Sequence, residues 1–242
     1  MLSNKQWITI RHHNQRLVGL YETKPSAETL LILFHGFTGT KTEAHYNFKH
    51  ISEALIKENI ATLRFDFLGS GESDGHFNEQ TKHVLKDQLE SIVTYAKSLN
   101  YNRLVCLGFS MSGLLLLESL EAAMNRVILI NPALNMAEIL TDLYRSKTPI
   151  LEENVDLDGL LLSREVVESF QETINLEPLK KYLNPILIFH SINDATVPIK
   201  YSEELVKSGL NIQLIKLDSN HTLSHYEVVQ GLIKSIITFI QK

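Results

Sequence analysis

Short apolar runs alternate with longer amphipathic segments along most of this chain. Each short run is soon followed by Gly, Asp, Asn or Ser, as is typical of strands buried on both faces of a sheet. Residues 7–21 carry two further apolar patches, which predict an antiparallel hairpin at the sheet edge. The runs themselves predict strands at Leu30–Phe34, Ala61–Phe65, Arg103–Leu107, Arg126–Ile130, Ile186–Phe189 and Ile212–Leu217.

Between these runs, apolar residues recur three and four positions apart, which predicts helices with one buried face. The predicted helices are Tyr46–Lys57, Lys82–Ser98, Ser110–Met124 and Tyr226–Ile240. Regular alternation of strand and helix indicates an α/β fold with a parallel sheet covered by helices on both faces. With the edge hairpin, the prediction is a mostly parallel sheet of eight strands.

The alternation stops between residues 133 and 182. Helical patterns occur at Met136–Tyr144 and Arg164–Thr173, and no strand is predicted between them. The segment holds five Lys and Arg against ten Asp and Glu, an excess equal to the net charge of −5 for the whole chain. An insertion of this length is too long for a plain crossover between parallel strands. We therefore expect residues 1–132 and 183–242 to form the core and residues 133–182 to form a lid.

Composition narrows the class of protein. The 242 residues are 44% hydrophobic, which is enough for one large core. A net charge of −5 with no basic stripe gives no reason to expect a nucleic-acid partner. Cys106 is the one cysteine, no signal peptide or membrane span is recognised, and we expect a cytoplasmic protein. There is no His-Glu-x-x-His motif or thiolate cluster, so neither a metal site nor a cofactor is predicted.

Ser110 follows a predicted strand and precedes a predicted helix, which is the setting of a nucleophile elbow. The sharp turn requires small residues two positions before and after the nucleophile, here Gly108 and Ser112. Ser112 is the weaker nucleophile candidate, because Leu114 would then crowd the turn. A helix N-cap with small neighbours would also fit this motif taken alone.

A second motif, His35-Gly36-Phe37-Thr38-Gly39, follows the strand Leu30–Phe34. A loop that opens in this way can aim a backbone N–H at a developing oxyanion, together with the N–H that follows the nucleophile. We assign these two donors to Phe37 and Met111. For His35 we expect a structural role, in which its side chain holds the loop by hydrogen bonds.

An acid and a base are expected after the nucleophile, in that order along the chain. Asp194 and His221 each lie just beyond a predicted strand, at the sheet edge where Ser110 also emerges. In this arrangement His221 takes the Ser110 proton and Asp194 orients the imidazole. His225 is the rival base, and Asp218 is a rival acid that more plausibly caps a turn.

Asp66 also follows a strand, but it precedes Ser110 and heads the turn that contains Gly69 and Gly71. We expect its carboxylate to hold this turn through backbone N–H groups. The two glycines do not form a phosphate-binding loop, because no Gly-Lys-Ser/Thr follows them.

Together these motifs resemble the bacterial cinnamoyl/feruloyl esterases of the α/β-hydrolase superfamily, from about residue 17 to the C-terminus. The motifs that carry the resemblance are His35-Gly36-Phe37-Thr38-Gly39, Arg64-x-Asp66-x-x-Gly69-x-Gly71-x-Ser73-x-Gly75-x-Phe77, the Ser110 elbow, Asp194 and His221. The resemblance implies the α/β-hydrolase fold, a Ser-His-Asp triad, oxyanion donors at Phe37 and Met111, and a lid over the acyl pocket.

The chain departs from that family at Met111 and Ser112, where Gln and Gly are usual, and at the lid stretch Asp158–Leu162, which is aliphatic. We therefore expect Leu160, Leu161 and Leu162 to bind substrate and favour a carboxylesterase for small to medium acyl esters. The alternatives are a feruloyl esterase proper, a thioesterase or acyltransferase (the elbow also resembles that of bacterial luminescence systems), and a non-catalytic ligand-binding module. The expected partner is a small acyl ester, and the sequence leaves open whether the chain forms a homodimer.

Overall fold

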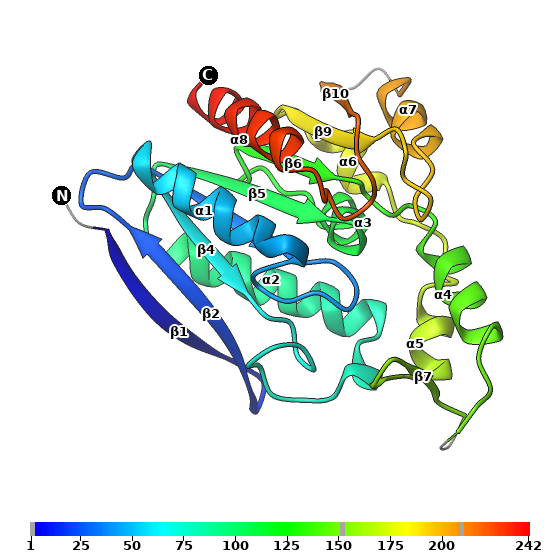
Figure 1. The fold of residues 1–242 in the computed structure, drawn as a ribbon. Helices are drawn as coiled ribbons and strands as arrows, with labels where there is room; N and C mark the ends of the chain where they lie inside the picture. The colour runs from blue at the N-terminus through cyan, green and yellow to red at the C-terminus, as the bar shows by residue number, and fades with distance from the viewer. Residues whose placement is uncertain (1–2, 151–152, 209–210) are drawn as a thin grey trace.

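The computed structural model describes residues 3–150, 153–208 and 211–242, and its centre is a twisted sheet of eight strands (Figure 1). The order across the sheet is β1-β2-β4-β3-β5-β6-β9-β10. The first two strands run antiparallel to their neighbours, and the other six are parallel. The strands are β1 (Asn4–His12), β2 (Gln15–Thr23), β3 (Thr29–Phe34), β4 (Ile60–Phe65), β5 (Arg103–Phe109), β6 (Arg126–Ile130), β9 (Ile186–Ser191) and β10 (Ile212–Leu217). The predicted hairpin and mostly parallel sheet are confirmed.

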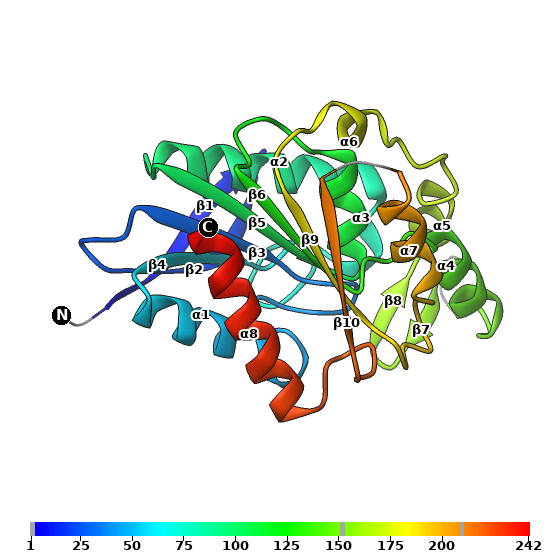
Figure 2. The same ribbon diagram turned by 90° about the horizontal axis from the view of Figure 1, so that it is seen from above.

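Helices cover both faces of the sheet, as predicted (Figure 2). Alternate side chains of a strand point to opposite faces, so Leu31 and Leu33 pack on one side and Leu30 and Ile32 on the other. One face is covered by α1 (Asn47–Lys57) and α8 (Tyr226–Gln241), and the other by α2 (Lys82–Ser98) and α3 (Met111–Glu118). A further short helix, α7 (Lys200–Val206), connects β9 to β10.

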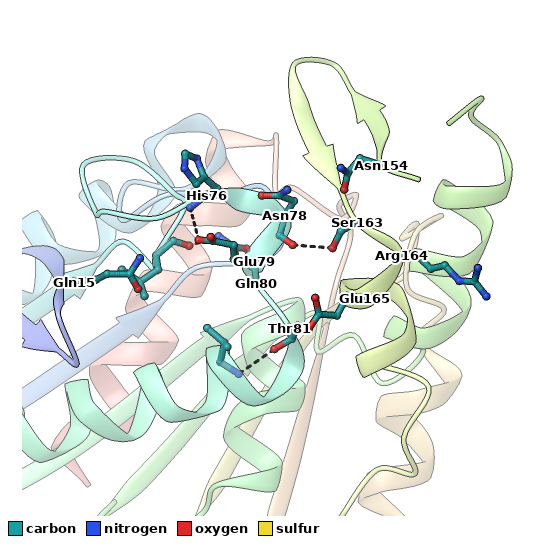
Figure 3. A pocket seen from close by; sticks show the side chains of 12 residues that line it. Gln15, His76, Asn78, Glu79, Gln80, Thr81, Asn154, Ser163, Arg164 and Glu165 are labelled. Atoms are coloured by element: carbon teal, nitrogen blue, oxygen red, sulfur yellow. Dashed lines mark hydrogen bonds between the residues drawn. The ribbon is translucent and has the colours of Figure 1, made fainter. Parts of the chain in front are cut away.

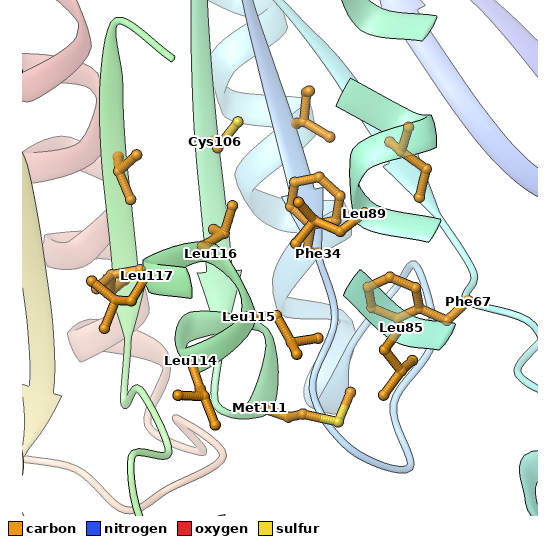
Figure 4. Close-up of a cluster of buried hydrophobic side chains, with 14 of the residues drawn as sticks. Phe34, Phe67, Leu85, Leu89, Cys106, Met111, Leu114, Leu115, Leu116 and Leu117 are labelled. Carbon is orange, nitrogen blue, oxygen red and sulfur yellow. The ribbon is translucent and has the colours of Figure 1, made fainter. Parts of the chain in front are cut away.

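Helix α3 is shorter than the sequence predicts. It ends at Glu118 instead of Met124, because the chain must turn back to enter β6 at Arg126. All eight of its residues are buried, in keeping with a helix that is apolar on every side. Figure 4 shows the leucines of α3 and Met111 packed against side chains of the sheet and α2. The helix that starts at the elbow is therefore held rigidly in the core.

The insert, residues 133–182, lies beyond one end of the sheet (Figure 1). Its elements are α4 (Met136–Arg145), β7 (Val155–Leu157), β8 (Leu160–Leu162), α5 (Arg164–Ser169) and α6 (Glu177–Lys181). Our prediction that this segment contains no strand is wrong, because β7 and β8 form an antiparallel ribbon. Asp158 and Gly159 both have positive φ in its turn, as an Asp-Gly hairpin requires. Strands of three residues are too short to produce a visible alternation.

Side-chain hydrogen bonds attach the insert to the core. Ser163 Oγ donates to the carbonyl of Asn78 at 2.7 Å, and Ser169 Oγ accepts from the Lys82 N–H at 2.9 Å. Figure 3 shows the first of these bonds at a polar cavity of about 590 Å³, with Gln15 on the core side and Arg164 on the insert side. The role of the insert as a lid stays a prediction.

Across the part of the chain that the structure describes, no helix is both long and apolar enough to span a membrane.

Candidate active site

Ser110 lies in the sharp turn from β5 to α3, with φ 51° and ψ −116°. Such backbone angles are unfavourable for a non-glycine residue and are typical of functional sites. A side-chain carbon built on Gly108 would lie 2.6 Å from the carbonyl oxygen of Ser112, so position 108 must be glycine. Ser112 fits where glycine is usual, and its Oγ donates a hydrogen bond to the His35 carbonyl. The elbow predicted from the sequence is therefore present.

Ser110, His221 and Asp194 meet in one hydrogen-bonded chain, although they come from the ends of three different strands. His221 Nε2 is 3.0 Å from Ser110 Oγ, and Nδ1 is 2.7 Å from Asp194 Oδ2. A carboxylate can only accept, so it holds the imidazole proton on Nδ1 and leaves the Nε2 lone pair facing the serine. Asp194 is fixed in turn, because its Oδ1 accepts the N–H groups of Thr196 and Val197.

The rival acid and base lie outside this chain of contacts. Asp218 is exposed and its carboxylate accepts a hydrogen bond from the Asn193 side chain at 2.9 Å. His225 is exposed at the start of α8, and its Nδ1 faces the backbone carbonyl of Asp218. Asp66 accepts the N–H groups of Lys41 and Glu72, as expected for a residue that holds its turn.

His35 and Glu43 fix the loop that carries Phe37. His35 Nε2 accepts the N–H of Phe67 and Nδ1 donates to the Gly36 carbonyl, and burial lowers the pKa of this histidine. The structural role predicted for His35 is confirmed. The carboxylate of Glu43 accepts the Gly36 N–H at 2.6 Å. A side-chain carbon at Gly36 would lie 3.2 Å from Cβ of Ser110, so the loop lies directly against the nucleophile.

A cavity of about 430 Å³ opens beside Ser110 and His221. Phe37 and Phe109 line it from the core, and its remaining core lining is mostly threonine. The insert contributes Met136, Ile139 and Leu143 of α4. The spacing of these three residues, i, i+3 and i+7, is a helical signal that marks them as one face of α4.

Leu160, Leu161 and Leu162 do not line this cavity. They form β8, which pairs with β7 and packs against the 3-10 helix η2 (Phe77–Glu79), and Leu162 is fully buried there. The apolar contribution of the insert to the cavity therefore comes from α4.

Asn131 also lies at the site, although no motif in the sequence points to it. It follows β6 with φ 46° and is fully buried. Its Oδ1 accepts the Ser191 N–H at 2.7 Å, and its Nδ2 donates to the His221 carbonyl at 2.8 Å. The carbonyl of the preceding residue, Ile130, accepts the Ser110 N–H at 2.9 Å. The end of β6 thus holds the backbone of both Ser110 and His221.

His190, buried four residues before Asp194, makes the fold sensitive to acid. Its Nε2 donates to the Val197 carbonyl at 2.9 Å, and its Nδ1 is 2.7 Å from Ser202 Oγ, whose hydroxyl can donate to the neutral ring. Burial lowers the pKa of His190 below its ordinary value of 6.5. The unfolded chain then binds the proton more readily, so this contribution to stability is complete above about pH 6.5 and is lost as the pH falls toward the folded pKa.

We therefore expect the free energy of unfolding, measured by urea titration, to decrease from pH 7.5 to pH 5.5. His190→Gln should make this dependence shallower, leaving the contribution of the buried His35, whereas His225→Gln, at an exposed position, should leave it as it is. If the free energy of unfolding of His190→Gln depended on pH as steeply as that of the wild type, the attribution of this acid sensitivity to His190 would be wrong.

The fold and this geometry can be compared with known proteins. Residues 25–167 match the hydrolase family described as serine aminopeptidase, S33. The chain belongs to this family. The predicted membership of the α/β-hydrolase superfamily is thereby confirmed. A search of curated proteins returned no match.

Solved structures share the fold of this S33 family member at low sequence identity. Est1E from Butyrivibrio proteoclasticus, solved with ferulic acid bound, has 24% identity and a TM-score of 0.83, over 97% of this chain and 98% of that one. An esterase from Pyrococcus furiosus has 19% identity and a TM-score of 0.76, over 98% and 90% of the two chains. An esterase from Exiguobacterium antarcticum has 15% identity and a TM-score of 0.72, over 94% and 96%.

Proposed function

We propose that this protein is a carboxylic ester hydrolase that cleaves small to medium acyl esters through an acyl-enzyme on Ser110. The observation that carries the proposal is the unbroken chain from Ser110 Oγ through both nitrogens of His221 to Asp194, with separations of 3.0 and 2.7 Å. A serine next to a base, oriented in turn by a third group, is the arrangement that activates a hydroxyl as a nucleophile.

In the proposed mechanism, Ser110 Oγ attacks the ester carbonyl while His221 Nε2 takes its proton. Asp194 stabilises the imidazolium that forms and remains ionised. The N–H groups of Phe37 and Met111 bind the developing oxyanion. His221 then protonates the departing alcohol, and a water molecule activated by the same histidine hydrolyses the acyl-enzyme.

The cavity supports the proposed substrate class. Its volume of about 430 Å³ is within the range of small-molecule sites. Met136, Ile139 and Leu143 give the insert side an aliphatic surface suited to a short or medium acyl chain. Est1E, with ferulic acid bound, makes a hydroxycinnamoyl ester the second substrate to test.

The proposal is tested by kcat/KM on four substrates. These are p-nitrophenyl butyrate, the corresponding thioester, p-nitrophenyl ferulate, and leucine p-nitroanilide as the aminopeptidase substrate. We expect the butyrate ester to be cleaved fastest. A higher value for the thioester would favour a thioesterase, a higher value for the anilide an aminopeptidase, and a higher value for the ferulate ester a feruloyl esterase. Each of these three outcomes would overturn the proposal.

Helix α4 is predicted to set the acyl-chain preference. Ile139→Ala should lower kcat/KM for p-nitrophenyl hexanoate by roughly tenfold or more and change the value for the acetate little, because only the longer chain reaches this wall. Leu161→Ala is the matched control, since Leu161 lies in the insert but outside the cavity. A loss confined to Leu161→Ala would assign chain selection to β8, and equal losses in the two variants would contradict a specific role of α4.

A further inference from the structure

Two histidines and an aspartate meet where the β1–β2 hairpin lies against α2, apart from the cavity at Ser110. His12 ends β1, His13 follows it in the turn, and Asp87 belongs to α2. Asp87 Oδ2 is 3.6 Å from His12 Nε2 and 3.0 Å from His13 Nε2. One ligand atom from each of the three residues lies within 4.8 Å of the ligand atoms of the other two.

These separations match the edges of a metal coordination tetrahedron. Zn²⁺ binds imidazole nitrogen and carboxylate oxygen at about 2.0–2.2 Å, which places neighbouring ligand atoms roughly 3.3 Å apart in tetrahedral geometry. The distances of 3.0 and 3.6 Å from Asp87 to the two histidines lie on either side of that value. Two of the three ligand–ligand separations are therefore already close to the length that Zn²⁺ requires.

Ser91, one turn along α2 from Asp87, supports a ligand role for His12. Its Oγ is 3.0 Å from His12 Nδ1. When Nδ1 carries the proton and donates it to Ser91, the Nε2 lone pair points toward Asp87 and His13. A hydrogen bond that fixes the tautomer of a metal-binding histidine in this way is a regular feature of zinc sites. The His12 side chain is 5% exposed and so is already held in place, whereas His13, at 78%, leaves an open side for a water ligand.

We propose that His12 Nε2, His13 Nε2 and the Asp87 carboxylate form a site for Zn²⁺ that joins the β1–β2 hairpin to α2. The site differs from the sequence-based expectation of no metal, because Asp87 is 74 residues from His13 and only the fold brings them together. Gln15, the first residue of β2, lines the polar cavity of Figure 3, so the bound ion would also fix one wall of that cavity.

The site is tested by calorimetric titration of the untagged, metal-stripped full chain with ZnCl₂. We expect one saturable site and an increase in Tm on binding, because an ion that binds only the folded state stabilises it. His13→Gln and Asp87→Asn should each abolish the saturable isotherm. Ser91→Ala should weaken binding by roughly 10–100-fold, as for other outer-shell partners.

His83→Gln is the matched control, because it removes a different exposed histidine, one that lies on α2 and pairs with Glu172. This variant should bind Zn²⁺ like the wild type. The metal-free Tm of His13→Gln should equal that of the wild type, since its side chain is largely exposed. No saturable binding by the wild type, or equal binding by His13→Gln and Asp87→Asn, would overturn the proposal, whatever the esterase assays show.

Discussion

Replacing Ser110 with alanine is expected to lower kcat on an ester substrate by roughly 10⁶-fold, the size of loss measured for a serine protease triad. The expectation rests on the 3.0 Å contact between Ser110 Oγ and His221 Nε2. Without the hydroxyl no acyl-enzyme can form, and only substrate binding and the oxyanion donors contribute to the remaining rate. Steady-state kinetics on p-nitrophenyl butyrate with purified variant protein measure the effect.

Ser112→Ala is the matched control for Ser110→Ala. Ser112 is fully buried in the same elbow, and its hydroxyl is used in the hydrogen bond to the His35 carbonyl. Its loss should reduce stability by about 1 kcal/mol and leave kcat within an order of magnitude of the wild type. If Ser112→Ala were the inactive variant and Ser110→Ala the active one, the assignment of the nucleophile would be wrong.

Asp194→Asn is expected to lower kcat by about 10⁴-fold with little change in structure. The asparagine amide can donate to His221 Nδ1, and the imidazole proton then moves to Nε2. A protonated Nε2 faces Ser110 but has no lone pair to accept the hydroxyl proton. Asparagine still offers an oxygen to the N–H groups of Thr196 and Val197, which Asp194 Oδ1 accepts in the wild type.

Asp218→Asn provides the comparison for Asp194→Asn. This carboxylate is exposed and bonded to the Asn193 side chain, so its loss should leave kcat close to the wild-type value. Circular dichroism of both variants separates an effect on chemistry from an effect on folding. A loss at Asp218 as large as that at Asp194 would reopen the choice of acid.

The central strands β3, β4, β5, β6 and β9 could be predicted because each is buried at nearly every position and is followed by turn residues. The strand β3, for example, is buried at all six positions, and an apolar run this short, followed by His-Gly, is typical of a buried strand. The ribbon of β7 and β8 could not be predicted, because three residues in each strand show no periodicity. The end of α3 was also misplaced, since Leu120 and Met124 are buried in the connection and continue the apolar pattern beyond the helix.

The residues of the candidate site differ in how far the sequence could reveal them. Ser110, Asp194 and His221 follow strands of a parallel sheet, so their meeting follows from topology. Asn131 follows β6 in the same way, but its role depends on side-chain hydrogen bonds that only the folded chain displays. The lining of the cavity by α4 depends on how the insert packs, which local patterns do not determine.

Ser110 is tested most directly as the nucleophile by reaction of the intact protein with a fluorophosphonate, followed by mass spectrometry of its peptides. An activated serine nucleophile is phosphonylated, whereas an ordinary buried serine is not. We expect one adduct per chain, located on Ser110. The adduct should be absent from Ser110→Ala and should form much more slowly in Asp194→Asn. An unmodified wild-type protein, or an adduct on another residue that persists in Ser110→Ala, would contradict the assignment of Ser110 as the nucleophile.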